Sequence, residues 1–361
     1  MENPTVNLLG MPKGDLEGMF ADMGEKPFRA RQVMQWLYGR SVFELDGMTD
    51  LSVALRRELS GRVRISLPEI QAREDSDDGV VKWRLSAGGG QVIETVFIPE
   101  EGRGTLCISS QVGCAMDCPF CATGRQGFNR NLTAAEIIGQ VLIADSELGT
   151  RRISNVVFMG MGEPLANLRA VAQAIDILVD DFGFGLSRRR VTVSTSGLVP
   201  QIRRLAELSN VALAVSLHAP NDELRNELVP INRRHPIADL LEVCWDYAKA
   251  TRSKDITFEY VMLAGVNDRE WHARQLAKLL TGRPAKINLI PFNTFPGTEY
   301  QRSSPETVDR FRQVLVTAGI ITITRRTRGD DISAACGQLA GQVKNLVRFP
   351  LGTKMHQSGV Q

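Results

Sequence analysis

Short β-rich runs alternate with longer helical patterns along most of this 361-residue chain, from residue 105 onward. The segments between the runs, such as Thr133–Leu148, space their apolar residues as a helix does. This alternation indicates an α/β fold in which crossover helices join parallel strands. Six such units suffice for a partial (βα)6 barrel, and a doubly wound open sheet is an alternative that periodicity does not exclude. The six runs are TLCISS, ISNVVFMG, RVTVSTS, VALAVSLH, ITFEYVML and AKINLIPF.

The first 85 residues differ from the rest and predict a small helical domain. Two short amphipathic stretches, Pro27–Tyr38 and Asp50–Leu59, are joined by a link that contains glycine. Arginines lie between the apolar residues of the first stretch, which fits a packed helix or a basic surface that faces nucleic acid. The packed helix is the favoured interpretation.

A β-hairpin is predicted after this domain, because Val80–Leu85 and Val92–Ile98 flank three consecutive glycines. We therefore expect four parts in the chain. They are a helical domain over residues 1–85, a hairpin linker over 86–104, a barrel with a functional C-terminal loop over 105–345, and a loose tail over 346–361.

The bulk composition is that of an ordinary soluble protein, with 43% hydrophobic and 23% charged residues. No apolar run approaches the roughly 18–20 residues that a membrane span needs. The first twenty residues lack the basic start and apolar stretch of a signal peptide. We expect a cytoplasmic protein without a membrane segment.

Most of the 43 basic residues are arginines, although the formal net charge is only +2. Arginine suits phosphate binding and stacking on bases, so these clusters are consistent with RNA contact. Coding from GC-rich DNA also favours arginine over lysine, and both explanations remain open. The clusters are Arg56-Arg57, Arg151-Arg152, Arg188-Arg189-Arg190, Arg203-Arg204, Arg233-Arg234 and Arg325-Arg326.

Three of the six cysteines lie within eight residues, in GCAMDCPFCATG, on a predicted loop after the first barrel strand. Thiolates at such short spacing suit an iron–sulfur cluster or zinc. Structural zinc needs a fourth Cys or His, and no histidine lies near the loop. We therefore predict that Cys114, Cys118 and Cys121 bind one 4Fe-4S cluster and leave one iron open.

The spacing C-x3-C-x2-C, with Phe120 before the last cysteine, resembles the radical S-adenosylmethionine superfamily. The resemblance implies that S-adenosylmethionine binds the open iron and is cleaved to a 5′-deoxyadenosyl radical. It also implies cofactor contacts at the ends of later strands. The matching residues are Gly162, Glu163, Ser194, Ser216, Leu217, His218 and Asn293.

Nearly the whole chain also resembles the RlmN-type RNA adenine-C2 methyltransferases. The segments that carry this resemblance are QVGCAMDCPFCATG, FMGMGEPLAN, VSTSG, VSLHAP, NLIPFN and SAACGQL. From residue type alone, Cys107, Cys244 and Cys336 would be buried packing residues and Glu94 an exposed strand carboxylate. Only for Cys244 does packing remain the favoured interpretation.

The resemblance gives the other three residues a role each. Cys336 takes a methyl group from one S-adenosylmethionine, and a second molecule supplies the radical that activates this group for addition to C2 of adenine. Glu94 accepts the C2 proton. Cys107 then attacks the Cys336 sulfur and releases the base, which leaves a transient disulfide for a reductant to reopen.

The implied substrates are an adenine of 23S rRNA and the adenine 3′ of a tRNA anticodon, and a flavodoxin-like reductant is the expected electron donor. The N-terminal module, with Arg29 and Arg31, is a candidate RNA-binding surface. Two alternatives remain open: a Cfr-type enzyme that methylates adenine C8 and confers antibiotic resistance, and a non-catalytic RNA-binding protein with structural zinc.

Overall fold

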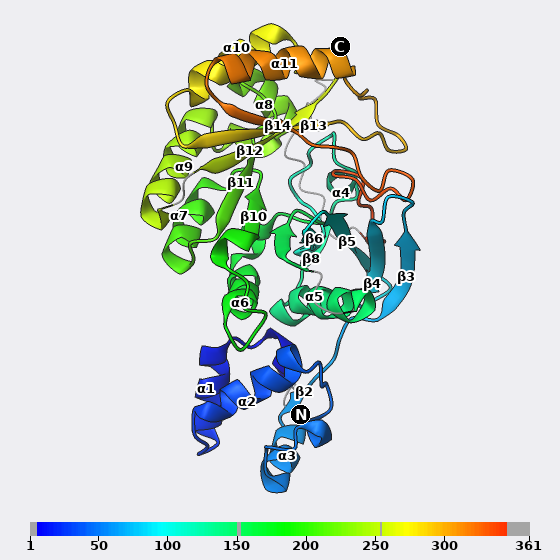
Figure 1. Cartoon of the computed structure of the whole chain (residues 1–361), viewed down its shortest axis with the longest axis vertical. Coiled ribbons are helices and arrows are strands. Elements are labelled where there is room, and N and C mark those ends of the chain that lie inside the picture. Colours follow the sequence, from blue (N-terminus) through cyan, green and yellow to red (C-terminus); the bar gives the residue numbers. More distant parts are fainter. Residues whose placement is uncertain (1–5, 150–152, 253–254, 345–361) are drawn as a thin grey trace, which may run out of the picture.

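A ten-stranded sheet forms the centre of the molecule (Figure 1), in a computed structural model that describes residues 6–149, 153–252 and 255–344. The strand order is β14-β13-β12-β11-β10-β9-β6-β5-β4-β3. From β6 to β14 neighbouring strands are parallel, whereas β3, β4 and β5 are antiparallel. The strands are β3 (Ile70–Asp75), β4 (Val81–Ser86), β5 (Val92–Glu100), β6 (Arg103–Cys107), β9 (Asn155–Phe158), β10 (Val191–Thr195), β11 (Ala212–Ser216), β12 (Ile256–Met262), β13 (Ala285–Pro291) and β14 (Ile321–Thr324).

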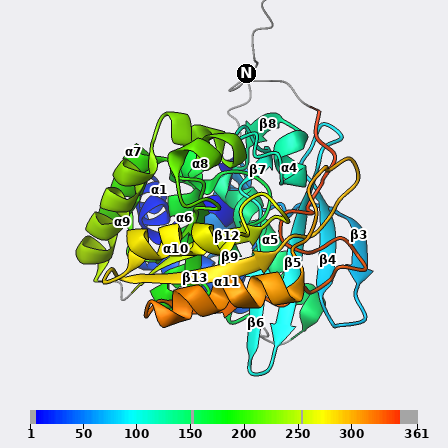
Figure 2. The same ribbon diagram turned by 90° about the horizontal axis from the view of Figure 1, so that it is seen from above.

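Helices connect successive parallel strands, as the alternation of patterns predicted. Each predicted run contains a strand, and the result is a partial barrel with free edges at β14 and β3. Figure 2 shows α7 and α9 at one side of the molecule and β3 and β4 at the opposite side. The helices of these connections are α5 (Ala134–Leu148), α6 (Leu168–Val179), α7 (Val199–Leu208), α8 (Asp222–Leu228), α9 (Ile237–Thr251), α10 (Glu270–Leu280) and α11 (Pro305–Thr317).

Helix α5 begins where the sequence predicted, because Thr133 and Glu136 form a capping box. The Thr133 hydroxyl accepts from the Glu136 backbone N–H at 3.2 Å, and the Glu136 carboxylate accepts from the Thr133 N–H at 2.8 Å. Apolar residues on several faces of the helix are buried, since it packs on α6 and against the segment Leu8–Gly10. The N-terminal segment approaches closely: a Cβ at Gly10 would lie 2.5 Å from the Ala135 nitrogen.

The N-terminal helices lie below α5 and α6 in Figure 1. They are α1 (Lys13–Asp22), α2 (Phe28–Met34), which continues as a π-turn over Gln35–Gly39, and α3 (Val53–Ser60). Val33, Trp36 and Leu37 are buried, in agreement with the packed helix, whereas Phe28 is 41% exposed. A short parallel pair, β1 (Val6–Asn7) with β2 (Val63–Arg64), closes this region.

The structure differs from the predicted first domain in the placement of residues 70–86. Strands β3 and β4 belong to the large sheet, so the helical part ends near Ser60 rather than at residue 85. Strand β3 was missed because its sequence, IQARED, lacks an apolar pattern. Its residues are exposed or half-buried, so the strand needs no apolar face. Strands β4 and β5 form the predicted hairpin. No helix among the described residues is long and apolar enough to cross a membrane, and the predicted tail lies outside those residues.

Candidate active site

Two cavities lie at the sheet, and Cys336 contributes to the wall of both. The first has a volume of about 180 Å³ and lies beyond the carboxyl ends of the parallel strands. It is lined by many of the predicted residues, namely Cys114, Cys118, Cys121, Gly162, Glu163, Ser194, Ser216, His218 and Cys336. The structure therefore brings together residues that are more than 200 positions apart.

The second cavity has a volume of about 640 Å³ and follows the inner face of the partial barrel. Its lining includes residues that are direct partners in neighbouring strands: Val157 with Thr192, Ala214 with Thr257, and Glu259 with Asn288. Several cations contribute to its wall, namely Arg103, Lys286, Arg325, Arg326 and Arg328. Asn293 lines this cavity and not the first one.

The cysteine loop lies between β7 (Gln111–Gly113) and α4 (Ala122–Arg125) and is closely packed. The Cys114 N–H donates to the Gly127 carbonyl at 2.8 Å. Gly113 has a φ of 76°, and a Cβ there would lie 2.0 Å from the same carbonyl oxygen, so only glycine fits. All three cysteines of this loop line the first cavity.

The donor set fits the predicted cluster. Burial raises the pKa of Cys114, Cys118 and Cys121, so the thiolate forms need a bound cation to be stable there. All three are free thiols. Within the described residues, no group of three or more His, Cys, Asp or Glu side chains could hold a single metal ion. A 4Fe-4S cluster does not need that convergence, because each thiolate binds a different iron.

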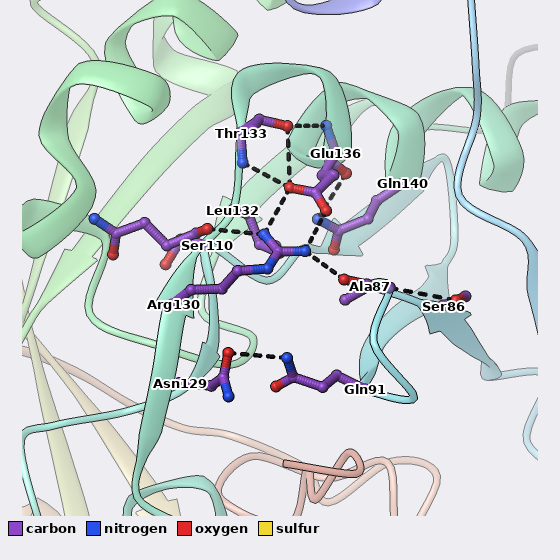
Figure 3. A network of polar contacts seen from close by, with 12 residues as sticks. Ser86, Ala87, Gln91, Ser110, Asn129, Arg130, Leu132, Thr133, Glu136 and Gln140 are labelled. Atoms are coloured by element: carbon purple, nitrogen blue, oxygen red, sulfur yellow. Dashed lines mark hydrogen bonds and ion pairs between the residues drawn. The ribbon is translucent and has the colours of Figure 1, made fainter. Parts of the chain in front are cut away.

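The loop is fixed from outside by a polar network (Figure 3) that joins the β4–β5 turn, β8 (Phe128–Asn131) and α5. The Arg130 guanidinium binds the Glu136 carboxylate at 2.6 Å and donates to the Ala87 carbonyl. The Gln91 amide donates to Asn129 at 2.9 Å. Because β8 pairs antiparallel with β7, these contacts also help to orient the strand from which the cysteine loop starts.

Glu163 is held at the end of β9 by hydrogen bonds. Its carboxylate accepts from the Ser196 N–H at 2.7 Å, the Ser196 hydroxyl at 2.8 Å and the Leu165 N–H at 3.0 Å. Burial nevertheless raises the pKa of Glu163. Gly162 has a φ of 99°, and a Cβ there would lie 2.5 Å from the Gln111 Cβ, so this turn requires glycine.

His218 is a buried, neutral ring beside the cysteine loop. Its Nδ1 accepts from the Val261 N–H at 3.0 Å, and burial lowers its pKa to about 3, with a further contribution from Arg225. The ring meets Phe120 edge to face at a centroid distance of 4.7 Å. Leu217 does not line the first cavity; its buried position holds the strand end through backbone contacts.

Arg225 is a buried residue of this site that the sequence analysis missed. Its guanidinium donates to the carbonyls of Ser196 at 2.6 Å, Ser216 at 3.0 Å and Leu217 at 3.1 Å. It therefore joins the ends of β10 and β11 under the predicted cofactor residues. Burial lowers its pKa to about 10. Its position in the polar helix segment DELRNEL gave no sign of this role.

Cys336 lies on an irregular segment, residues 325–344, that runs beside β4, β5 and α4 (Figure 1). The thiol is exposed, and the Asn293 amide donates to the Cys336 carbonyl at 3.3 Å. Cys107 is buried at the end of β6, where burial, followed by the charge of Cys336, raises its pKa to about 12. Cys107 lines neither cavity, but its β9 partner Val157 lines the second.

Glu94 does not line either cavity. Its carboxylate accepts from the Ala340 N–H at 3.0 Å, so in this structure it holds the segment that carries Cys336. Burial raises the pKa of Glu94. Cys244 is fully buried in α9, as the packing interpretation predicted.

Comparison with known proteins adds to this geometry. Residues 108–277 match the model of the radical SAM superfamily, and residues 6–65 match that of the ribosomal RNA large subunit methyltransferase N-terminal domain. A solved radical SAM methyltransferase from Sphaerobacter thermophilus is 45% identical, with a TM-score of 0.86 over 92% of this chain and 99% of its own.

More distant solved structures are also similar. Streptococcus suis SuiB bound to S-adenosylmethionine is 12% identical, with a TM-score of 0.46 over 63% of this chain and 52% of its own. A spore photoproduct lyase mutant is 13% identical, with a TM-score of 0.46 over 89% of this chain and 99% of its own.

Proposed function

This chain belongs to the RlmN-type methyltransferases of the radical SAM superfamily, and we propose that it methylates C2 of adenine in 23S rRNA and in tRNA, 3′ of the anticodon. The observation that carries this proposal is the position of Cys336 in the wall of both cavities. A thiol in that position can accept a methyl group from a cofactor in the first cavity and present it to a base in the second cavity.

Cys114, Cys118 and Cys121 would hold one 4Fe-4S cluster, and Gly162, Glu163, Ser194, Ser216 and His218, which line the same cavity, would hold S-adenosylmethionine. Leu217 and Asn293, which the resemblance also implied, do not line this cavity, so a contact from them would need a movement of their strand ends. When bound, the cluster and S-adenosylmethionine would supply a 5′-deoxyadenosyl radical. His218 and Glu163 are each held by hydrogen bonds from the backbone, His218 from the Val261 N–H and Glu163 from the Ser196 N–H. These contacts fix the two side chains in the wall of the proposed cofactor site.

Cys336 carries the carbon that is transferred. Its sulfur would take a methyl group from one S-adenosylmethionine, which leaves as S-adenosylhomocysteine. The S-methyl group would then give one hydrogen atom to the 5′-deoxyadenosyl radical, which leaves as 5′-deoxyadenosine, before its carbon bonds to C2 of adenine. Two S-adenosylmethionine molecules are therefore used in each turnover, one for the methyl group and one for the radical. A flavodoxin-like reductant is the proposed electron donor.

Cys107 and Glu94 complete the reaction. Glu94 takes the C2 proton, which its burial-raised pKa favours. Because its carboxylate binds the Ala340 N–H, the segment after Cys336 would have to shift for this step. The unpaired electron of the adduct would return to the one-electron carrier. Cys107 would then bond to the Cys336 sulfur as the sulfur–carbon bond breaks, the bonding pair would stay with the base, and a proton would complete its methyl group. The Cys107–Cys336 disulfide then needs a two-electron thiol reductant.

The second cavity is the proposed site of the target adenine. The C2 edge is hidden in a helix, so the base must be single-stranded or extruded. The cations in the cavity wall can bind the neighbouring phosphates. These substrates and the reduced thiols suit the cytoplasm.

Mass mapping of modified adenines in 23S rRNA and tRNA tests the position of the methyl group. We expect 2-methyladenine, and the match of residues 6–65 to the ribosomal RNA methyltransferase domain supports this choice. Detection of 8-methyladenine would instead identify a Cfr-type activity.

Anaerobic reconstitution tests the class of the protein. We expect visible iron–sulfur absorbance, together with one 5′-deoxyadenosine and one S-adenosylhomocysteine for each methylated adenine. Stoichiometric zinc without 5′-deoxyadenosine would instead support a non-catalytic RNA-binding protein.

A further inference from the structure

Four residues on neighbouring strands form a row across the sheet, from the first cavity to the second. Ser216 is the direct partner of Glu259, Glu259 of Asn288, and Asn288 of Ile323. Direct partners place their side chains on the same face of a sheet. Ser216 lines the first cavity, Glu259 lines both, and Asn288 and Ile323 line only the second. The row therefore runs from the proposed cofactor site to the free edge of the sheet at β14.

Asn288 is the one amide of this row, and its orientation is fixed. Its Nδ2 donates to Oε1 of Glu259 at 2.9 Å. Burial raises the pKa of Glu259, but Oε1 keeps a lone pair for this bond in both protonation states. The Asn288 side chain is half-buried, and its Oδ1 accepts no hydrogen bond from the described residues. An acceptor and one remaining N–H of a fixed amide are thus available in the second cavity.

Glu259 is itself held in place, next to the residue that would carry the methyl group. Its side chain lies on β12, and the residue is 4% exposed. Its Oε2 lies 3.9 Å from Nη1 of Arg325, and the same nitrogen lies 3.8 Å from the Sγ of Cys336. The Arg325 N–H donates to the Leu289 carbonyl at 2.8 Å. The fixed amide of Asn288 therefore belongs to the wall that also carries Cys336.

An amide in this setting has the hydrogen-bonding pattern that adenine needs. The 6-amino group of adenine donates, and the ring nitrogen beside it accepts, so one amide can pair with both. Guanine has a carbonyl oxygen at the same place, which would oppose Oδ1 of Asn288. Ile323 is 53% exposed and offers an apolar surface to the face of a base. Lys286, two residues before Asn288 on β13, lines the same cavity and suits a phosphate.

We propose that Asn288 determines the base specificity of this enzyme: its Oδ1 accepts from the 6-amino group of the target adenine, and Glu259 is a positioning residue that turns the amide toward the cavity. This inference rests on the proposed function. S-adenosylmethionine also contains adenine, but Asn288 does not line the first cavity. The base that it reads is therefore that of the RNA. Asn288 opens the segment NLIPFN, in which only Asn293 had a role until now.

Removal of the 6-amino group from the RNA tests the contact without methyl transfer. The full-length, cluster-loaded protein is kept anaerobic with S-adenosylhomocysteine in place of S-adenosylmethionine. Fluorescence anisotropy then measures the Kd of two tRNA anticodon stem-loops. One has adenosine at the target position, and the other has purine ribonucleoside, which lacks the amino group. The ratio of the two Kd values reports the contact, because any general loss of RNA binding cancels in it.

Wild type should bind the adenosine stem-loop about tenfold more tightly, the effect of one hydrogen bond. Asn288→Leu keeps the shape of the side chain, removes its polar atoms, and should lower this ratio to about one. Ile323→Ala should weaken both RNAs and leave the ratio unchanged, since the apolar contact does not involve the amino group. Asn210→Leu is the matched control, because Asn210 is exposed after α7 and lines neither cavity.

Equal Kd values for the two RNAs in wild type would overturn the inference, and so would a wild-type ratio in folded Asn288→Leu protein. If circular dichroism shows that this variant is unfolded, Asn288→Ser decides by the same ratio. Calorimetry should show unchanged S-adenosylhomocysteine binding in the variant. Weaker binding with an unchanged RNA ratio would instead assign the amide to the cofactor and overturn the inference.

Methylation of the adenosine stem-loop by wild type with S-adenosylmethionine separates this inference from the proposed function. Absence of 2-methyladenine in both this stem-loop and 23S rRNA would overturn the proposed function and the inference with it. Methylation of the stem-loop together with equal Kd values would overturn the role of Asn288 alone.

Discussion

Arg328 binds Asp78 across 250 residues of sequence and ties the segment that carries Cys336 to the turn between β3 and β4. Nε of Arg328 lies 2.8 Å from the Asp78 carboxylate, and its Nη2 donates to the Asp78 carbonyl at 2.7 Å. The Gly329 N–H donates to the same carboxylate at 3.1 Å. Nearby, the Ser76 hydroxyl donates to Asp331 at 2.6 Å. The antiparallel edge of the sheet therefore supports the proposed methyl-carrying loop.

Asp78→Ala should slow methyl transfer from Cys336 to RNA about tenfold or more, because a small displacement of a reacting group is costly. Loss of these partly exposed contacts should lower the free energy of unfolding by only about 1 kcal/mol. Single-turnover kinetics and urea unfolding separate the two effects. Asp77→Ala is the matched control, since its side chain is exposed on the same turn. Equal rates for the two variants would show that the Asp78–Arg328 contact does not position Cys336.

The two lone cysteines should give opposite results when each is replaced. Cys107→Ala leaves no thiol to release the base, so a covalent protein–RNA adduct should accumulate. Cys336→Ala removes the atom that carries the methyl group, so no adduct should form. Denaturing gel electrophoresis with labelled RNA distinguishes the two. Cys244→Ala serves as the control, because Cys244 is buried in α9 and lines neither cavity. Turnover by Cys336→Ala would contradict the proposed mechanism.

Glu136→Gln should destabilise the protein in a pH-dependent way. Although burial opposes it, hydrogen bonds from Arg130 and Thr133 lower the pKa of Glu136. A lowered folded-state pKa adds stability above the unfolded pKa, and this stability is lost as pH falls through the folded value. Wild type and Glu136→Gln should therefore differ by about 1–3 kcal/mol at pH 7 and converge in acid.

Urea unfolding at several pH values measures the effect of Glu136→Gln. Glu147→Gln is the control on the same helix, because the Glu147 pair with Arg73 is exposed and should contribute little. A Glu136 difference that stays constant down to pH 3 would show that the ionised carboxylate is not the stabilising form.

Local patterns were enough to predict most of the barrel elements. Thr133 and Glu136 have the spacing of a capping box, and α5 begins there. The β-rich runs became parallel strands, but β14 was not predicted, although its residues ITIT are β-branched and alternate between apolar and polar. Strand β3, at the opposite edge, was missed because IQARED lacks an apolar pattern.

The site was predictable only in part. The spacing of Cys114, Cys118 and Cys121 indicated a cluster by itself, because ligands that are close in sequence leave a visible pattern. Arg225, on α8, meets the ends of β10 and β11 only through the fold, and Arg325 meets Glu259 only because segments distant in sequence lie in one sheet. No local pattern marks Arg225 or Glu259, and the arginine pair that contains Arg325 indicated at most RNA contact. Cys107 and Glu94 required the family resemblance, since residue type favoured packing for one and an exposed carboxylate for the other.

The structure separates the two arginines of the proposed N-terminal RNA surface. Arg29 binds Glu25 at 3.2 Å and Gln32 at 2.9 Å, and its side chain is 19% exposed. Arg31 is exposed, and its guanidinium lies 5.8 Å from the centre of the Phe182 ring. An arginine whose donors are already used within the protein contributes less to phosphate binding than a free one.

Arg31→Ala should therefore weaken RNA binding and reduce the salt slope by about 0.7–0.9, the value for one lost phosphate contact. Arg29→Ala should change the slope less and lower stability more, because Glu25 loses its partner. Fluorescence anisotropy with a labelled tRNA anticodon stem-loop, between about 50 and 200 mM salt, measures both slopes. If Arg31→Ala leaves the slope at the wild-type value, this face of α2 does not contact the RNA backbone.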